Sequence, residues 1–242
     1  MKRLFLLLAA MAVTLVVASG VALAVNKIGT NGPDTLRGTN GDDNLLGKGA
    51  NDVLYALGGR DNLLGGEGKD WVLGGDERRT LGGEKTLVGG PGNDGVFGGN
   101  DSDNMVGGSG NDVLWGQRGS DRLVGGGGND IVDGWEGSDR LFGGGGADLF
   151  VDGPFDDTSK DEILSGGDGD DAFFVDNVPA TRDIVSCGDG FDRLAADAKD
   201  QVASDCEQVR RGPNAGVHLN DELEEEGLPD IIFEGLAPFP EG

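Results

Sequence analysis

Residues 125–133 read GGGGNDIVD. They follow the nine-residue pattern Gly-Gly-x-Gly-x-Asp-x-U-x, in which U is a large apolar residue. The pattern recurs in phase, with aspartates nine residues apart at Asp34, Asp43, Asp52, Asp61 and Asp70, and again at Asp94, Asp103, Asp112, Asp121, Asp130, Asp139 and Asp148. The U residues that follow them are Leu36, Leu45, Leu54, Leu63, Val72, Val96, Met105, Leu114, Leu123, Val132, Leu141 and Phe150. A period kept over so many units indicates a repeat architecture in which each unit packs on its neighbours.

Each unit joins a tight turn to a short strand. Glycine adopts the positive φ angles of tight turns without steric cost, and the three residues around U can form a strand. Such a short strand is unstable alone but can pair in parallel with the equivalent strands above and below. Two units, or eighteen residues, then make one coil with a strand on each side. The U residues point inward, so we predict a narrow apolar core between two sheets.

The composition requires something to neutralise the carboxylates. Of 242 residues, 48 are glycine, and acidic residues outnumber basic ones by 44 to 19, which gives a formal net charge of −25. A chain this polar and charged would otherwise be disordered. The turns direct carbonyl oxygens toward one point, and each Asp adds a carboxylate. Such oxygen ligands in a flexible site favour calcium over zinc or copper, whereas the negative charge argues against nucleic acid as a partner.

Successive turns alternate between the two edges of the roll, so one ion should be held by units eighteen residues apart. The predicted calcium ligands are the twelve aspartates above and Asp171 of a later unit, GGDGDDAFF. Counting along the chain gives one edge with Asp34, Asp52, Asp70, Lys85, Asp103, Asp121 and Asp139, and another with Asp43, Asp61, Arg79, Asp94, Asp112, Asp130 and Asp148. Adjacent aspartate pairs on these edges would hold about eight calcium ions.

The period is broken between Asp70 and Asp94, which are 24 residues apart rather than the 27 of three units. In this degenerate coil, at about residues 75–90, Arg79 and Lys85 stand at aspartate positions. Two interpretations are open. In the first, the coil is shortened and free of calcium, with its basic groups near Asp61, Asp70, Asp94 and Asp103. In the second, two units have drifted without consequence and keep their bases in solvent.

Residues 1–24 are predicted to be a secretory signal peptide. Lys2 and Arg3 precede the apolar run Leu4–Val17, and Ala22-Leu23-Ala24 forms a small-x-small cleavage site. The alternative is an uncleaved membrane anchor, for which the run is short. With cleavage, no membrane span remains, and the protein is expected to be secreted into a compartment that is oxidising and rich in calcium.

The remaining segments are less regular. Residues 25–151 form the predicted roll, residues 152–211 carry degenerate repeats and a cap, and residues 212–242 read as an acidic disordered tail. Within the tail, residues 228–239 could instead be a peptide that docks on a partner or on the protein itself. Cys187 and Cys206 are the two cysteines of the chain, and export favours a disulfide between them over two free thiols.

The units GGSGNDVLW, GGGGNDIVD and GGGGADLFV resemble the RTX, or haemolysin-type, calcium-binding repeat. The resemblance implies a parallel β-roll with calcium in its turns that folds outside the cell when it meets calcium. The later segment SCGDGFDRLAADAKDQVASDCEQV resembles the end of small secreted bacterial proteins of this type. The predicted fold is therefore all-β: a right-handed parallel β-roll, or two-sheet solenoid of nonapeptide repeats, with an irregular disulfide-closed C-terminal cap and a disordered tail.

The predicted function is that of a secreted calcium-binding protein without catalytic activity, in a structural or surface-associated role. The single histidine, His218, excludes a histidine-based triad or a two-histidine zinc site. One alternative is an extracellular carbohydrate- or surface-binding module that uses outward aromatic residues, which are Tyr55, Trp71, Phe97, Trp115, Trp135 and Phe142. Polysaccharide or the cell surface would then be the partner. Another alternative is a polysaccharide-modifying enzyme, which the small space outside the repeats disfavours.

Overall fold

The computed structural model describes residues 24–75, 83–151, 161–175 and 182–211. Within these ranges the chain forms strands and no helix, and the strands make two parallel ten-stranded sheets. The first sheet contains β1 (Asn26–Ile28), β3 (Asn44–Gly49), β5 (Asn62–Glu67), β7 (Thr86–Pro91), β9 (Asn104–Ser109), β11 (Arg122–Gly127), β13 (Arg140–Gly145), β15 (Ile163–Asp168), β17 (Ile184–Asp189) and β19 (Gln201–Val202). The second contains β2 (Thr35–Arg37), β4 (Val53–Tyr55), β6 (Trp71–Leu73), β8 (Gly95–Asn100), β10 (Val113–Gly119), β12 (Ile131–Gly137), β14 (Leu149–Val151), β16 (Ala172–Val175), β18 (Arg193–Ala196) and β20 (Gln208–Arg211).

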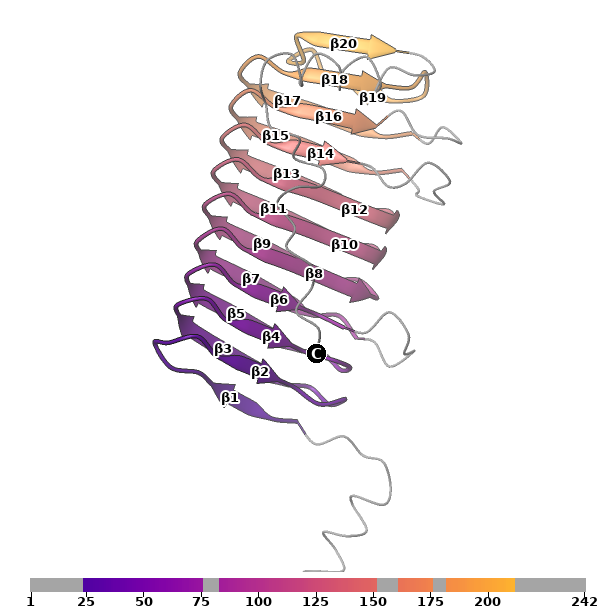
Figure 1. The fold of residues 1–242 in the computed structure, drawn as a ribbon. Helices are drawn as coiled ribbons and strands as arrows, with labels where there is room; N and C mark the ends of the chain where they lie inside the picture. The colour runs from indigo at the N-terminus through magenta and orange to yellow at the C-terminus, as the bar shows by residue number, and fades with distance from the viewer. Residues whose placement is uncertain (1–23, 76–82, 152–160, 176–181, 212–242) are drawn as a thin grey trace, which may run out of the picture.

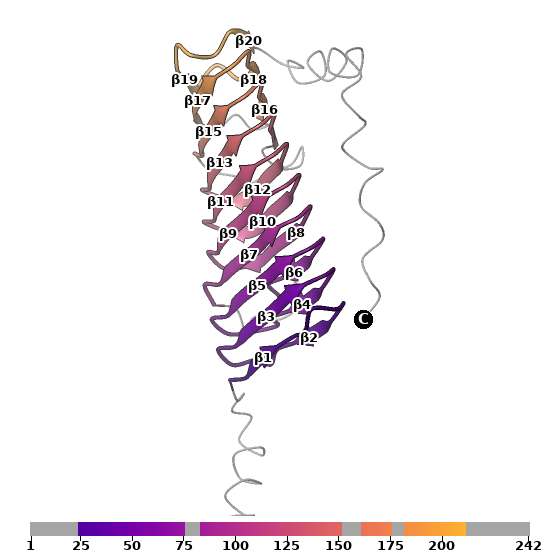
Figure 2. The same cartoon turned by 90° about the vertical axis from the view of Figure 1, so that its left-hand side faces the viewer.

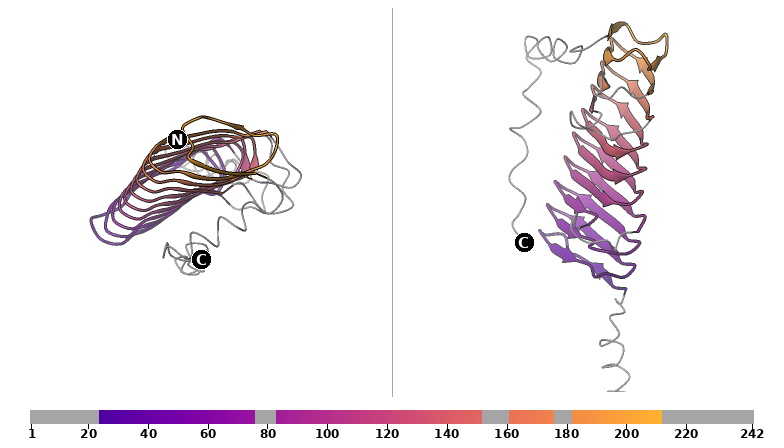
Figure 3. Two further views of the ribbon diagram at one scale, coloured as in Figure 1. Left: turned by 90° about the horizontal axis from the view of Figure 1, so that it is seen from above. Right: turned by 90° about the vertical axis from the view of Figure 1, so that its right-hand side faces the viewer.

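Successive strands alternate between the two sheets, so each coil of the chain adds one strand to each sheet (Figures 1 and 2). Seen along the stack, the coils lie over one another as flattened loops (Figure 3). The register repeats the sequence period, because Val113 of β10 pairs with Ile131 of β12, eighteen residues on. The predicted two-sheet parallel solenoid is confirmed.

The core is the space between the sheets, and the predicted U residues fill it. From Leu45 to Phe150 each of them is buried, and Leu36 near the N-terminal end packs partly buried against the cluster. The stack continues beyond the regular repeats, where the rings of Phe150 and Phe173 stack with centroids 4.5 Å apart. Each inward residue thus contacts the equivalent residue of the next coil, and the core is a ladder rather than a globular cluster.

Glycine is required in the turns for two separate reasons. A Cβ on Gly125 would clash with Oδ2 of Asp130 and would lie 2.8 Å from the carbonyl oxygen of Gly143 in the next coil. Gly126 has a φ of +124°, in the left-handed region that residues with a Cβ rarely adopt. The first glycine of the unit therefore makes room for the aspartate, and the second turns the backbone.

The broken period is resolved differently from the predicted edges. Strand β6 pairs with β8 and β5 pairs with β7, so Trp71 faces Gly95 and Asn62 faces Thr86. Asp94 therefore follows Asp70 in one stack, and Lys85 follows Asp61 in the other. The predicted edges, in which Lys85 follows Asp70 and Asp94 belongs to the edge of Asp61, are therefore wrong at this point. The prediction of a shortened coil is also wrong, since the coil from Asp70 to Asp94 spans 24 residues instead of 18. Arg79 lies outside the described residues.

Both sheets continue through the degenerate region to a cap. Strands β15 to β20 extend the two stacks, and β19 and β20 end them (Figure 1). Cys187 of β17 is fully buried and forms a disulfide with Cys206, which confirms the predicted bond. The predicted signal peptide (apart from residue 24), His218 and the predicted tail lie outside the described residues.

Candidate calcium-binding columns

The aspartates of the repeat form two columns, one along the edge of each sheet at which its strands begin. Each aspartate directly precedes a strand, and because the strands are in register the aspartates of alternate units stack. We call the first the Asp70 column: Asp34, Asp52, Asp70, Asp94, Asp112, Asp130, Asp148, Asp171 and Asp192. We call the second the Asp61 column: Asp43, Asp61, Lys85, Asp103, Asp121, Asp139, Glu162 and Asp183. All thirteen predicted ligands stand in these two columns, twelve of them buried and Asp34 half-buried.

In the column aspartates that follow Asp34, one carboxylate oxygen links each coil to the one before it. The backbone N–H of Asp112 donates to Oδ1 of Asp130 at 2.8 Å, and the backbone N–H of Asp121 donates to Oδ1 of Asp139 at 2.6 Å. The same bond links Asp70 to Asp94 at 2.7 Å across the longer coil. These bonds pair backbone donors that the turn would otherwise leave without a partner.

The second carboxylate oxygen of these aspartates has no hydrogen-bond partner, although it is buried. This is the state of Oδ2 in Asp52, Asp61, Asp70, Asp94, Asp103, Asp112, Asp121, Asp130, Asp148, Asp171 and Asp192. A buried anionic oxygen without a donor is costly unless a cation or a proton reaches it. Each turn therefore presents one oxygen that is prepared for a cation.

Burial governs the acidity of these groups. Burial, together with smaller contributions from the charges of neighbouring aspartates, raises the pKa of Asp121 and Asp148 to about 8; burial also raises the pKa of Asp103 to about 7, against the lowering effect of Lys85. For Asp121, burial has the largest effect, ahead of the Asp139 charge and against the backbone hydrogen bond from Asp103 that lowers the pKa. A bound cation would favour the ionised carboxylates, because it compensates both the lost hydration and the mutual repulsion.

The ligands around each Oδ2 suit calcium better than zinc. At Gly107 a Cβ would clash with Oδ2 of Asp112 and would lie 2.7 Å from the carbonyl oxygen of Gly125, so the carboxylate of one turn and a carbonyl of the next face the same small space. Within the described ranges, no three His, Cys, Asp or Glu side chains converge on one point. Backbone carbonyls must therefore complete the shell, which is the oxygen-rich set of calcium and not the side-chain set of a structural zinc site.

The family comparison agrees with this geometry. The model of the RTX calcium-binding nonapeptide repeat matches in four copies, over residues 28–63, 46–81, 86–114 and 115–150. The chain belongs to the RTX calcium-binding repeat family. RTX nonapeptide repeats bind Ca²⁺, and the two buried aspartate columns fit that property. No curated protein matches the chain.

The Asp70 and Asp61 columns, together called the RTX columns, contain acidic residues that were not among the predicted ligands. Asp192 is fully buried, its Oδ1 accepts a bond of 2.9 Å from the backbone N–H of Asp171, and its Oδ2 has no hydrogen-bond partner. The available signal was the buried Leu194 two residues later, which repeats the Asp-x-U spacing. In an earlier degenerate unit the column position is held by Glu162, the residue after Asp161.

Lys85 is the one basic residue within the RTX columns as the structure describes them. Its side chain is only 2% exposed, and its positive charge lowers the pKa of Asp61 and Asp103, although burial outweighs this effect and raises both. The prediction that a basic group lies near these two aspartates is confirmed for Lys85. The alternative that places this lysine in solvent is wrong.

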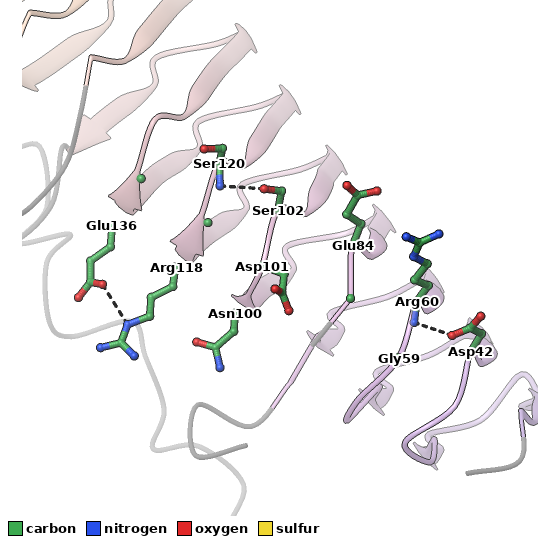
Figure 4. A pocket seen from close by; sticks show the side chains of 13 residues that line it. Asp42, Gly59, Arg60, Glu84, Asn100, Asp101, Ser102, Arg118, Ser120 and Glu136 are labelled. Atoms are coloured by element: carbon green, nitrogen blue, oxygen red, sulfur yellow. Dashed lines mark hydrogen bonds and ion pairs between the residues drawn. The ribbon is translucent and has the colours of Figure 1, made fainter. Parts of the chain in front are cut away.

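A shallow polar hollow of 1030 Å³ lies on the outside of the turns along the Asp61 column (Figure 4). Residues of both signs line it, among them Asp42, Arg60, Glu84 and the ion pair of Arg118 with Glu136 at 3.0 Å. The hollow follows the outer rim of the coils and contains no group of three possible metal ligands among the described residues. In the same described ranges, no helix could span a membrane.

Proposed function

We propose that the chain is a secreted protein that binds several calcium ions in its RTX columns, folds when it binds them, and serves a structural or surface-associated role without catalysis. The main support for this proposal is the series of buried Oδ2 atoms that have no hydrogen-bond partner, repeated coil after coil. A single such atom would be a local defect. A series of them, each beside a turn carbonyl, is a set of equivalent cation sites.

The charge balance supports coupling between calcium binding and folding. The chain carries a formal net charge of −25, and the column aspartates are stacked directly over one another. Without metal, each coil added to the stack buries another carboxylate beside the last one. The Asp70 column contains eight adjacent pairs of acidic residues and the Asp61 column five. One calcium ion at each pair, about thirteen ions, would bring roughly +26 of charge to the columns. Because the sites exist only in the stacked state, calcium affinity becomes folding free energy.

Two features support export. The N-terminal residues have the charge, apolar run and cleavage site of a signal peptide. The buried Cys187–Cys206 disulfide is the kind of bond that persists in oxidising compartments. Calcium is abundant in the same compartments, so a protein that needs it to fold would remain unfolded until exported.

The test of the function is a count of bound ions. Purified protein is freed of metal by dialysis, titrated with calcium, and the bound ions are measured by atomic spectroscopy after equilibrium dialysis. With one ion for each adjacent pair of acidic residues in the two columns, we expect about thirteen ions per chain rather than the eight counted on the predicted edges. A count of none or one would overturn the proposal, since the columns repeat the same site many times.

A row of aromatic rings supports carbohydrate binding as a second candidate function. Trp71 of β6 stacks on Phe97 of β8 with centroids 5.6 Å apart, and Trp115 of β10 meets Phe97 edge-on at 5.3 Å. Phe97 is only 3% exposed, so the ring predicted to face outward is covered. Tryptophan fluorescence titrated with polysaccharides, and retention on a polysaccharide column, test this candidate. No spectral change and no retention would remove it.

A further inference from the structure

Lys85 occupies an aspartate position inside the Asp61 column. It directly precedes β7, which pairs in parallel with β5 and β9, so Lys85 stacks between Asp61 and Asp103. The backbone N–H of Thr86 donates to the carbonyl oxygen of Asp61 at 2.9 Å, and the backbone N–H of Lys85 donates to Oδ1 of Asp103 at 2.8 Å. The backbone pairing of the column thus continues at Lys85, where a lysine stands in the place of an aspartate.

The Lys85 side chain behaves as an internal cation. Its Nζ donates to the carbonyl oxygen of Gly83 at 3.1 Å, so the ammonium takes an oxygen of the turn. No carboxylate oxygen of the described residues lies within 4.0 Å of Nζ, so Lys85 forms no direct ion pair with them. Its attraction to the carboxylates of Asp61 and Asp103 is therefore electrostatic and acts over a longer distance. An ammonium has no acceptor, so Lys85 cannot supply the side-chain oxygen that links the coils elsewhere in the column.

A lysine at an aspartate position has two effects on calcium binding. A ligand is lost, and a fixed positive charge stands between Asp61 and Asp103, whose Oδ2 atoms are buried without hydrogen-bond partners. A divalent ion entering either neighbouring space would meet one carboxylate fewer and a buried like charge at short range. The Asp70 column has no such interruption at this level, because Asp70 donates directly to Asp94 at 2.7 Å.

We propose that Lys85 is a built-in cation that excludes calcium from the two turn spaces beside it, so that the Asp61 column binds calcium in separate blocks while the Asp70 column binds it continuously. This inference rests on the proposed calcium binding. It makes Lys85 the residue that determines which turns take calcium. It also makes this coil the least dependent on calcium, since its positive charge is covalently attached.

The substitution Lys85→Asp tests the inference, because it restores both the missing ligand and the acceptor for the coil-to-coil bond. We expect this variant to bind about one or two more calcium ions than the wild type, and its melting temperature to fall more steeply than that of the wild type as the calcium concentration is lowered. Equilibrium dialysis and thermal melts at a series of calcium concentrations measure both. If Lys85→Asp folds in calcium and binds the same number of ions as the wild type, the inference is overturned.

A second variant decides the matter if Lys85→Asp does not fold. Lys85→Met removes the charge, keeps the length and adds no ligand, so we expect the wild-type ion count but a severalfold higher calcium concentration at the folding midpoint. An unchanged midpoint overturns the inference. The matched control is Lys69→Met, an exposed turn lysine whose replacement changes the net charge equally and should leave the midpoint unchanged. Failure of the wild type itself to bind calcium would instead overturn the proposed function.

Discussion

A column aspartate uses its two oxygens for two different purposes. In Asp112, Oδ1 accepts the backbone N–H of Asp94 at 2.7 Å, whereas Oδ2 is buried without a hydrogen-bond partner. Asparagine could keep the first function and not the second, because its Oδ1 remains an acceptor while an NH₂ group replaces the second oxygen. The two roles can therefore be separated by one substitution.

We expect Asp112→Asn to reduce the number of bound calcium ions by about one or two and to lower the melting temperature in calcium. Without calcium, the circular dichroism of the variant should show no less β structure than that of the wild type, because burial raises the pKa of Asp112 to about 7 and the substitution removes that buried charge. Ion counting, thermal melts and circular dichroism check these statements. Asp101→Asn, at an exposed turn position, is the control and should change neither. An unchanged ion count for Asp112→Asn would contradict the assigned ligand.

Two glycines of one repeat provide a matched pair. Gly125→Ala places a Cβ against Oδ2 of Asp130 and the carbonyl oxygen of Gly143, whereas a Cβ on Gly127 meets nothing within 4 Å. We expect Gly125→Ala to cost about 1–3 kcal/mol of unfolding free energy in calcium, and Gly127→Ala to be neutral or slightly stabilising. Chemical denaturation measures both. Equal effects of the two substitutions would show that the space beside the aspartate is not required.

At the scale of elements, the core ladder and the strand pairs were predictable from the sequence, because residues eighteen apart in the repeat occupy equivalent positions in neighbouring coils. The aspartate columns were predictable for the same reason, up to the break. Counting units then failed, since it assumed that every unit turns the chain onto the other edge. Val72 pairs with Val96 and Leu63 pairs with Leu87, so burial of equivalent U residues sets the register, and the paired positions on either side of the break are 24 residues apart instead of 18. Only the register of the folded sheets reveals that Lys85 follows Asp61.

The columns also determine how the metal-free roll responds to pH. Their aspartates have folded-state pKa values raised by burial, for example to about 6 for Asp94 and about 8 for Asp148, above the ordinary value of about 4. Groups with raised pKa values stabilise the fold when protonated, and this contribution is lost as the pH rises through the folded-state pKa. Metal-free protein should therefore be more stable at about pH 5 than at about pH 8.

Far-ultraviolet circular dichroism of dialysed protein at the two pH values checks this expectation, because more of the metal-free protein should be folded at pH 5 than at pH 8; pH 5 remains above the isoelectric point of about 4.1. In saturating calcium the order should reverse, because protons compete with calcium for the same carboxylates. Metal-free protein that is more stable at pH 8 than at pH 5 would argue against buried carboxylates as the main cost of the empty columns.

At the scale of the whole molecule, the acidic composition and the fold are one feature. A chain with a net charge of −25 and 48 glycines has little apolar surface to bury, and its core consists of two rows of U residues, one from each sheet. The disulfide at Cys187 closes one end of that core. Neither the thin core nor the disulfide compensates the buried carboxylates along the columns, so the stability of the roll depends on cations.

Far-ultraviolet circular dichroism of the purified protein, metal-free and then with added calcium at neutral pH, tests this dependence most directly. The account predicts a disordered spectrum without calcium and a cooperative change to a β spectrum as calcium is added, with magnesium at equal concentration much less effective because it prefers rigid octahedral sites. A β spectrum of the same intensity in the metal-free protein would contradict it.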